Sequence, residues 1–298
     1  MPKTPGVLRV AVVIAGASLG AALLAAGPFA AARMASAPST AGAGSHAPAA
    51  FRASDRVHPT ISVAKSAGFG VKTSQSNNWS GYNQGILDTG KQYSAITGTW
   101  TVPTATQHTT GQAEYSASWI GIGGGCLDSS CSATDSTLIQ AGTEQDVSST
   151  GEASYSAWYE LIPAPSIAST IAVHPGDVIR CSITQSTPGL WTIVLTDTTD
   201  GQGFSQTVPY SSTEATAEWI EETPVVVGSS GSAGISALPN LGTVAFSGAT
   251  ANGADPGLVP AQAIQLIDSN NNVLATPSAP AGGNAFNDCT FATSCATP

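Results

Sequence analysis

Charged residues are scarce in this 298-residue chain, since Asp, Glu, Lys and Arg together make up only 9% of it. Cations are rarest after residue 73, where Lys91 and Arg180 stand against 18 acids and the net charge is −16. Proteins that bind nucleic acid need a basic surface to contact the phosphates. The composition therefore excludes nucleic-acid binding. Because few salt bridges can form, few can be broken when acid protonates the carboxylates. The composition therefore suits acidic surroundings.

Histidine bases and cofactor motifs are also lacking. Serine and cysteine hydrolases need a histidine base, but only four histidines are present: His46 and His58 fall in the leader, while His108 and His174 lie in no recognisable motif. The chain has no H-E-x-x-H, paired C-x-x-C or glycine-rich phosphate loop. We therefore expect no metal and no other cofactor. The chemistry left to the protein is that of carboxylates, amides and aromatic rings.

Helical periodicity is absent as well, because no long stretch repeats apolar residues at helical spacing. The chain instead has many short β-like runs separated by turn residues, including 32 Gly and 19 Pro. This pattern predicts an all-β, antiparallel sandwich or barrel formed by one domain over residues 74–276. The predicted strands are 93–102, 115–122, 136–142, 153–162, 170–173, 178–184, 190–197, 204–210, 215–222, 243–246 and 264–267.

Residues 1–73 differ from the rest, with seven Lys or Arg against one acid. Lys3 and Arg9 precede an apolar run over 10–26 that is followed by alanine-rich sequence, which is the layout of a secretory signal peptide over 1–35. A retained membrane anchor is the alternative, but the run is short for a span. Residues 36–73 read as a basic, disordered pro-segment. The mature protein would be secreted and extracellular, with no membrane contact after signal cleavage.

Five cysteines are present, and two pairs are close enough in sequence to form small disulfide loops. These pairs are Cys126 with Cys131 and Cys289 with Cys295. The fifth, Cys181, alternates onto an apolar strand face and is expected to be a buried, inert thiol. Residues 277–298, which contain the second pair, are expected to form a loosely ordered tail.

Three carboxylates are concentrated in the short stretch 217–222. In a strand, side chains alternate between the two faces, so Glu218 and Glu222 would share one face and Glu221 would lie on the other. An acidic face that only keeps the sheet soluble is the simple interpretation. The alternative is that one of these carboxylates does chemistry.

Five motifs in a fixed order support the second interpretation. They are the stretches 78–82, 118–122, 138–144, 157–160 and 217–222. Together they resemble the glutamic peptidases, also called eqolisins or peptidase family G1. The resemblance implies a β-sandwich of two packed, curved antiparallel sheets, similar to concanavalin A and other lectins. It also implies a secreted endopeptidase that is active in acid, acts on polypeptide substrates and is insensitive to pepstatin.

The resemblance also assigns the site. The catalytic pair would be Gln140 and Glu222, and the substrate would contact Trp79, Trp119, Glu144, Trp158 and Glu160. Glu222 would take a proton from the attacking water and return it to the leaving amine, while the Gln140 amide would donate to the developing oxyanion. Glu218 would raise the pKa of Glu222 by like-charge repulsion. We expect a monomer whose basic pro-segment inhibits it near neutrality by covering the acidic body.

Three departures from the family pattern leave alternatives open. Gly123 stands where the family often has aspartate, Glu144 replaces another common aspartate, and the stretch containing Cys126 and Cys131 is longer than in fungal members. A degenerate peptidase is therefore one alternative. A non-enzymatic carbohydrate-binding sandwich, in which tryptophans stack on sugars, is the other.

Overall fold

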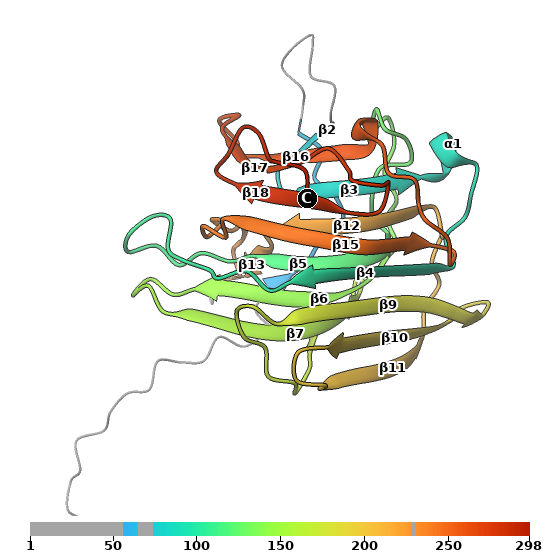
Figure 1. The fold of residues 1–298 in the computed structure, drawn as a ribbon, viewed down its shortest axis with the longest axis horizontal. Coiled ribbons are helices and arrows are strands. Elements are labelled where there is room, and N and C mark those ends of the chain that lie inside the picture. The colour runs from blue at the N-terminus through green and yellow to red at the C-terminus, as the bar shows by residue number, and fades with distance from the viewer. Residues whose placement is uncertain (1–55, 65–73, 228–230) are drawn as a thin grey trace, which may run out of the picture. The chain divides into compact units, whose positions relative to one another are not determined.

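The structure is a computed structural model that describes residues 56–64, 74–227 and 231–298. These residues form a strand-rich body (Figure 1) whose only α-helix in the described ranges is the single turn α1 (Ile86–Thr89), with a 3-10 turn η2 at Pro260–Gln262. Strand pairing in the main sheet is antiparallel apart from β2 (Ser74–Ser76), which pairs in parallel with β16. The predicted all-β, antiparallel fold is confirmed. Within the described part of the chain, no helix has the length and apolar character needed to span a membrane.

The main sheet folds over into two layers. One layer runs in the order β11 (Gly203–Pro209), β10 (Leu190–Asp197), β9 (Val178–Thr187), β4 (Ala95–Thr101), β15 (Thr243–Ala251) and β18 (Phe286–Thr290). The sheet then continues through β17 (Val273–Pro277), β16 (Ala263–Ile267), β3 (Trp79–Gly85), β12 (Thr216–Glu222), β5 (Ala117–Gly123), β6 (Leu138–Val147), β7 (Ala153–Leu161) and β8 (Ile167–Ala168). A separate small sheet contains β1 (Arg56–Val57), β13 (Val225–Val227) and β14 (Ala233–Ile235).

The main hydrophobic core lies between the two layers. One residue in two along each central strand points into it, including Ile120 of β5 and Trp219 of β12 from one layer and Ile183 of β9 from the other. Two indole groups tie the layers together, because Trp219 Nε1 donates to the Thr97 carbonyl at 2.8 Å and Trp100 Nε1 donates to Thr143 Oγ1 at 2.9 Å. Burying each such large side chain stabilises the fold by about 1.5–3 kcal/mol. This packing confirms the sandwich architecture.

Several sequence predictions can be compared with the structure at this level. Both expected disulfides are present, and Cys181 is a buried free cysteine. The predicted strand at 170–173 is wrong: this stretch is a loop, whose apolar residue Val173 is buried against the core. Residues 1–55 and 65–73, which hold the predicted signal peptide and most of the predicted pro-segment, lie outside the described residues. Residues 56–64 of that pro-segment are described, and they are extended instead of disordered.

The prediction of a loosely ordered tail over 277–298 is also wrong. Residues 286–290 form β18, which lies between β15 and β17 in the sheet. Phe286 of this strand is fully buried and stacks on Phe246 at 4.9 Å between ring centroids. The tail is therefore part of the core, and the domain extends well beyond residue 276.

Two carboxyl groups, Asp288 of β18 and Glu221 of β12, are buried on the core side of the sheet. The Asp288 side chain accepts a hydrogen bond from Ser80 Oγ at 2.9 Å, and Glu221 accepts one from Ser118 Oγ at 2.6 Å. Burial raises the pKa of Asp288 to about 7 and raises the pKa of Glu221 well above its ordinary value. Each folded-state pKa lies above the unfolded value, so the fold holds these protons more tightly than the unfolded chain does. Their contribution to stability is complete in acid and is lost as the pH rises.

Asp288→Asn tests this pH dependence. Because Asp288 titrates near 4 when unfolded and about 7 when folded, it should cost the wild-type protein on the order of 4 kcal/mol of unfolding free energy between pH 4 and pH 7. Asparagine does not titrate, so the variant should lose correspondingly less over that interval. Urea unfolding at the two pH values measures this, with the exposed Glu152→Gln as control. Equal losses in wild type and Asp288→Asn would contradict the assignment.

Candidate active site

Five adjacent strands, β3, β12, β5, β6 and β7, carry the predicted site residues on the layer face that points away from the core; we call this the site face. The strand register sets Glu222 of β12 beside Ala117 of β5, and sets Gln140 of β6 opposite Glu160 of β7. Side-chain alternation then turns the functional groups to one side. A second apolar cluster on this face includes Trp79, Trp119, Leu138 and Trp158.

A glycine makes room for this arrangement. Gly142 pairs with Trp119 on one neighbouring strand and with Trp158 on the other. A Cβ atom at Gly142 would lie only 2.4 Å from the Trp119 Cβ atom and 2.4 Å from the Ser118 carbonyl oxygen. Trp119 can therefore take this position only because residue 142 has no side chain.

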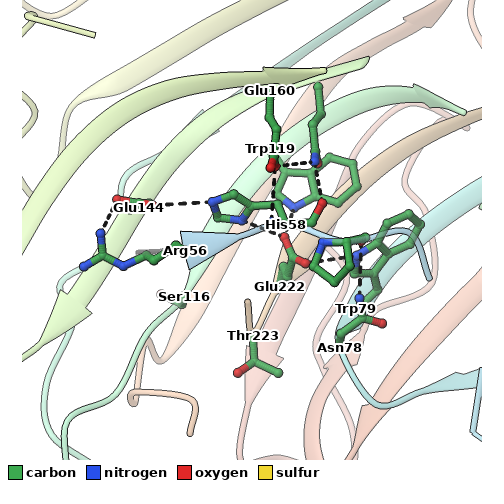
Figure 2. A network of polar contacts seen from close by, with 12 residues as sticks. Arg56, His58, Asn78, Trp79, Ser116, Trp119, Glu144, Glu160, Glu222 and Thr223 are labelled. Atoms are coloured by element: carbon green, nitrogen blue, oxygen red, sulfur yellow. Dashed lines mark hydrogen bonds and ion pairs between the residues drawn. The ribbon is translucent and has the colours of Figure 1, made fainter. Parts of the chain in front are cut away.

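Glu222 is fully buried and is held by two indole groups. Trp119 Nε1 donates to Glu222 Oε2 at 2.9 Å, and Trp79 Nε1 donates to Glu222 Oε1 at 3.3 Å (Figure 2). The two rings pack edge to face, with centroids 4.9 Å apart. Trp79 and Trp119 therefore orient this carboxylate, and their N–H edges are not available for any other partner.

Gln140 is also fully buried. Its Nε2 donates to Glu160 Oε2 at 3.0 Å, so the Glu160 carboxylate fixes which end of the amide faces the site. The same Nε2 donates to the carbonyl oxygen of His58 at 2.7 Å. Gln140 Oε1 has no hydrogen-bond partner among the described residues. This amide thus presents a donor to a peptide carbonyl and keeps an acceptor for a second group.

The peptide in the site belongs to the chain itself. The described stretch 56–64, which we call the leader segment, crosses the site face, and its strand β1 pairs with β13 through Arg56 opposite Val226 and Val57 opposite Val225. His58 is fully buried and stacks on Trp158, with centroids 3.8 Å apart and the planes within 5° of parallel.

Acidic side chains surround the two cations of the leader segment. His58 Nδ1 lies 3.0 Å from Glu222 Oε2, and His58 Nε2 lies 3.4 Å from Glu144 Oε1. Figure 2 shows the imidazole between these two carboxylates, with Arg56 beyond Glu144. Arg56 forms ion pairs with Glu144, at 3.1 Å, and with Asp146, and its guanidinium lies over the Tyr115 ring at 5.1 Å from the centroid.

These contacts shift several pKa values. Burial alone would lower the pKa of His58, but the ion pair with Glu144, the hydrogen bond to Glu222 and the charges of Glu222 and Glu160 raise it to about 10, so the imidazole is a cation. Burial raises the pKa of Glu160 to about 7 and also raises the pKa of Glu222, with the His58 charge limiting the rise at Glu222. Burial would raise the pKa of Glu144 too, but the ion pairs with His58 and Arg56 outweigh burial and leave the pKa of Glu144 lowered.

The second half of the leader segment is attached differently. Ile61 N donates to the Gly124 carbonyl at 2.9 Å, and Ala64 N donates to the Gln75 carbonyl at 2.9 Å. Asn78 Oδ1 accepts from Ser62 N at 2.7 Å, and its Nδ2 donates to the Thr60 carbonyl at 3.2 Å. These bonds involve amides and carbonyls, none of which titrates in acid.

The structure brings together all seven predicted site residues: Trp79, Trp119, Gln140, Glu144, Trp158, Glu160 and Glu222. The expectation that Glu218 raises the pKa of Glu222 by like-charge repulsion is not confirmed. The Glu218 side chain is buried below the glycine-rich loop at Gly125, and the pKa of Glu222 is raised mainly by burial, not by Glu218.

The backbone explains why glycine stands at position 123, where the family often has aspartate. Gly123 has φ +93°, and a Cβ atom there would meet the Thr137 carbonyl oxygen at 2.1 Å. Aspartate does not fit this backbone.

Sequence reasoning missed three participants. Arg56 and His58 were assigned to a disordered leader, and Asp146 was not singled out. The period-2 alternation did contain a signal for Asp146, since it follows Gln140 and Glu144 on the same face of β6. The opposite charges of residues 1–73 and the rest predicted an attraction, but not which residues meet. The described residues contain no cluster of three or more His, Cys, Asp or Glu side chains arranged to hold a metal ion.

Comparison with known proteins gives a consistent result. Residues 77–287 match the sequence model of the Peptidase A4 family. Aspergillopepsin-2 of Aspergillus niger is 27% identical over 226 residues, which cover 68% of this chain and 74% of that protein. The fold is similar to scytalido-glutamic peptidase bound to a transition-state analogue inhibitor, with a TM-score of 0.56 and 22% identity over 72% of this chain and 98% of that one. It is also similar to SCP-B, an eqolisin solved with the tripeptide Ala-Ile-His, with a TM-score of 0.52 and 20% identity over the same shares.

Proposed function

Because the chain belongs to the Peptidase A4 family and is a glutamic endopeptidase, we propose that it is a secreted acid protease that hydrolyses peptide bonds with Glu222 and Gln140. The observation that carries the proposal is the position of one peptide carbonyl. The His58 carbonyl oxygen accepts from Gln140 Nε2 at 2.7 Å, while the imidazole of the same residue lies on Glu222. An amide donor and a carboxylate therefore converge on a single residue of an extended peptide.

The mechanism follows from the chemistry of these two groups. A substrate carbonyl in the place of the His58 carbonyl receives the hydrogen bond from Gln140 Nε2, and this bond strengthens as negative charge develops on the oxygen. A water between Glu222 and the free Gln140 Oε1 gives a proton to the carboxylate as it attacks the carbonyl carbon. The protonated Glu222 then returns that proton to the leaving nitrogen. Glu160 positions the Gln140 amide, and the two indoles position Glu222.

The carbohydrate-binding alternative has less support. Sugar stacking needs open faces on the aromatic rings, whereas Trp79 and Trp119 are fully buried and pack on each other with their N–H groups on Glu222. The ring of Trp158 is covered by an imidazole. This arrangement favours peptide chemistry over sugar stacking.

The direct experiment is acid proteolysis. The secreted protein, held at pH 3–4, should digest denatured haemoglobin, and pepstatin should not prevent it. A polysaccharide pull-down at the same pH should recover no protein. Binding to the polysaccharide without any digestion of haemoglobin would favour the carbohydrate-binding alternative and reject the proposed function. A protein that shows neither property would be the degenerate peptidase.

The leader segment also has a proposed role, as an inhibitor of its own site. It fills the position of a substrate, and its two cations are held by carboxylates that lose charge in acid. As the pH falls, Glu160 and Asp146 take up protons and the attraction for Arg56 and His58 weakens. The secreted precursor is therefore proteolytically inactive near neutrality and becomes active in acid.

Arg56→Ala tests this inhibition. Without the guanidinium, the leader segment loses its ion pairs from Arg56 to Glu144 and Asp146 and is held less tightly, so the precursor should begin to cleave a fluorogenic peptide at a higher pH than the wild type does. Initial rates measured directly after stepping the precursor to each pH give the midpoint of activation. Val63→Ala serves as a control in the same segment, since Val63 is 40% exposed. A midpoint that is the same in Arg56→Ala and wild type would contradict the inhibitory role.

A further inference from the structure

The leader segment occupies the site in a defined register. Within this segment, the carbonyl of His58 is the one that accepts from Gln140 Nε2, and the His58 N–H donates to Glu160 Oε2 at 3.2 Å. The dyad is therefore presented with one particular peptide bond, the one that joins the His58 carbonyl carbon to the Pro59 nitrogen.

We propose that the His58–Pro59 bond is the site at which this enzyme cuts its own chain, and that the His58 imidazole delays the cut by occupying the place of the attacking water. The proposal rests on the proposed function, because the same Glu222 and Gln140 carry out the hydrolysis. It adds a processing site and a reason why that site survives in the precursor.

The imidazole blocks the reaction because of where it lies. Its Nδ1 is 3.0 Å from Glu222 Oε2. The carboxylate oxygen that would take a proton from water therefore accepts a hydrogen bond from the imidazolium N–H instead. The groups that face the imidazole are Glu222 from β12, Glu144 from β6, and Glu160 with the Trp158 ring from β7. When acid protonates Glu160, the imidazolium is held less tightly and can turn away, which admits water to the ionised carboxylate of Glu222.

The hydrolysis then balances without any further reagent. Water adds its oxygen to the His58 carbonyl carbon and gives a proton to Glu222. The bond between that carbon and the Pro59 nitrogen breaks as Glu222 returns the proton to the nitrogen. The products are a new carboxyl group on His58 and a new secondary amine on Pro59.

The two cleavage products should differ in how tightly the folded domain holds them in acid. Residues 56–58 are held by the pairing of β1 with β13 and by the charged contacts of Arg56 and His58, and the charged contacts weaken in acid. Residues 59–64 are held by hydrogen bonds to Gly124, Asn78 and Gln75 that do not titrate. The acid-treated enzyme should therefore lose the first product and keep a chain that begins at Pro59.

The test uses the complete secreted precursor, purified near neutrality and stepped to pH 4. N-terminal sequencing and intact mass should show that the first new N-terminus is Pro59. The rate constant for its appearance should not change over a tenfold dilution, because each site holds its own bond. In the same mixture, a mass-tagged Glu222→Gln precursor should remain uncut at this bond. Haemoglobin digestion is measured in parallel.

His58→Phe tests the delaying role of the imidazole. Phenylalanine keeps a flat ring to stack on Trp158 but cannot donate to Glu222. Losing one hydrogen bond to a charged group should raise the rate of self-cleavage by about tenfold or more. At pH 6 this variant should form the Pro59 terminus about tenfold faster than the wild type, whereas Val63→Ala should match the wild type. Equal rates in His58→Phe and wild type would overturn this part of the proposal.

The outcomes separate the two proposals. If haemoglobin is digested but the first new terminus is not Pro59, or if the wild type cuts the tagged variant at this bond, the self-cleavage proposal is wrong and the proposed function stands. If neither haemoglobin nor the chain itself is cut in acid, the proposed function fails.

Discussion

Glu222→Gln is expected to lower kcat/KM for acid proteolysis by about 10⁴-fold while leaving the fold intact. Glutamine has nearly the same shape, so the packing of the site is kept, although its single oxygen can accept from only one of the two indole N–H groups of Trp79 and Trp119. It cannot accept a proton from water, however, and general acid–base catalysis is worth about 10²–10⁴ in rate. Because Glu222 serves as the base in one step and the acid in the next, the upper end of that range is expected. Haemoglobin digestion at pH 3–4 and a urea unfolding curve measure the two properties.

Glu218→Gln is the matched control for that variant. Glu218 lies on the same strand and the same face, four residues away, and is equally buried. It contacts neither the indoles nor the leader segment in any described hydrogen bond, so kcat/KM should stay within a few-fold of wild type. If Glu222→Gln retained wild-type activity, or if Glu218→Gln lost as much, the choice of Glu222 as the catalytic carboxylate would be wrong.

Gln140→Ala is expected to lower kcat by about 10²–10³-fold, which corresponds to about 3–4 kcal/mol of transition-state stabilisation for one oxyanion donor. KM should change little, because this hydrogen bond is stronger to the oxyanion than to the neutral carbonyl. Steady-state kinetics with a fluorogenic peptide separates the two constants.

Gln145→Ala is the comparison for that substitution. Gln145 is a buried glutamine on the core face of the same strand, where its Nε2 donates to Thr143 Oγ1 at 2.6 Å. Its loss should reduce stability without changing kcat. A fall in kcat that is the same in both variants would mean that damage to β6, not loss of the oxyanion donor, explains the effect.

The face of each site strand could be predicted from the sequence because it depends only on alternation. Glu222 and Gln140 point to the site face while Glu221 points to the core, as period-2 spacing requires. The order of five short motifs was sufficient to name the family. In contrast, the role of Glu218 could not be predicted, because sharing a face with Glu222 did not establish a contact. The loop at Gly125 separates Glu218 from the leader segment.

The contacts of the leader segment could not be predicted for a different reason. His58 and Glu222 are 164 residues apart in the chain, and no local pattern joins them. The composition of residues 36–73 favours disorder when they are considered alone. Residues 56–64 are ordered by the carboxylates and strand edges of the folded domain. β18 was missed for a similar reason, since its sequence Phe-Asn-Asp-Cys-Thr has only one large apolar side chain and acquires its place from the strands on either side.

The carboxyl groups in the core have a consequence for where this enzyme can persist. Unfolding at any pH between the unfolded and folded pKa values of Asp288 and Glu221 releases protons, so a neutral medium pulls the protein toward the unfolded state by mass action. The pH range in which the enzyme can be used is thus limited twice, by different parts of the chain. In our proposal the leader segment and the dyad decide the pH at which it works, whereas two carboxyl groups that face the core, Glu221 on β12 and Asp288 on β18, decide the pH at which it stays folded. Engineering the enzyme for use in neutral media would require changes on both faces of the sheet.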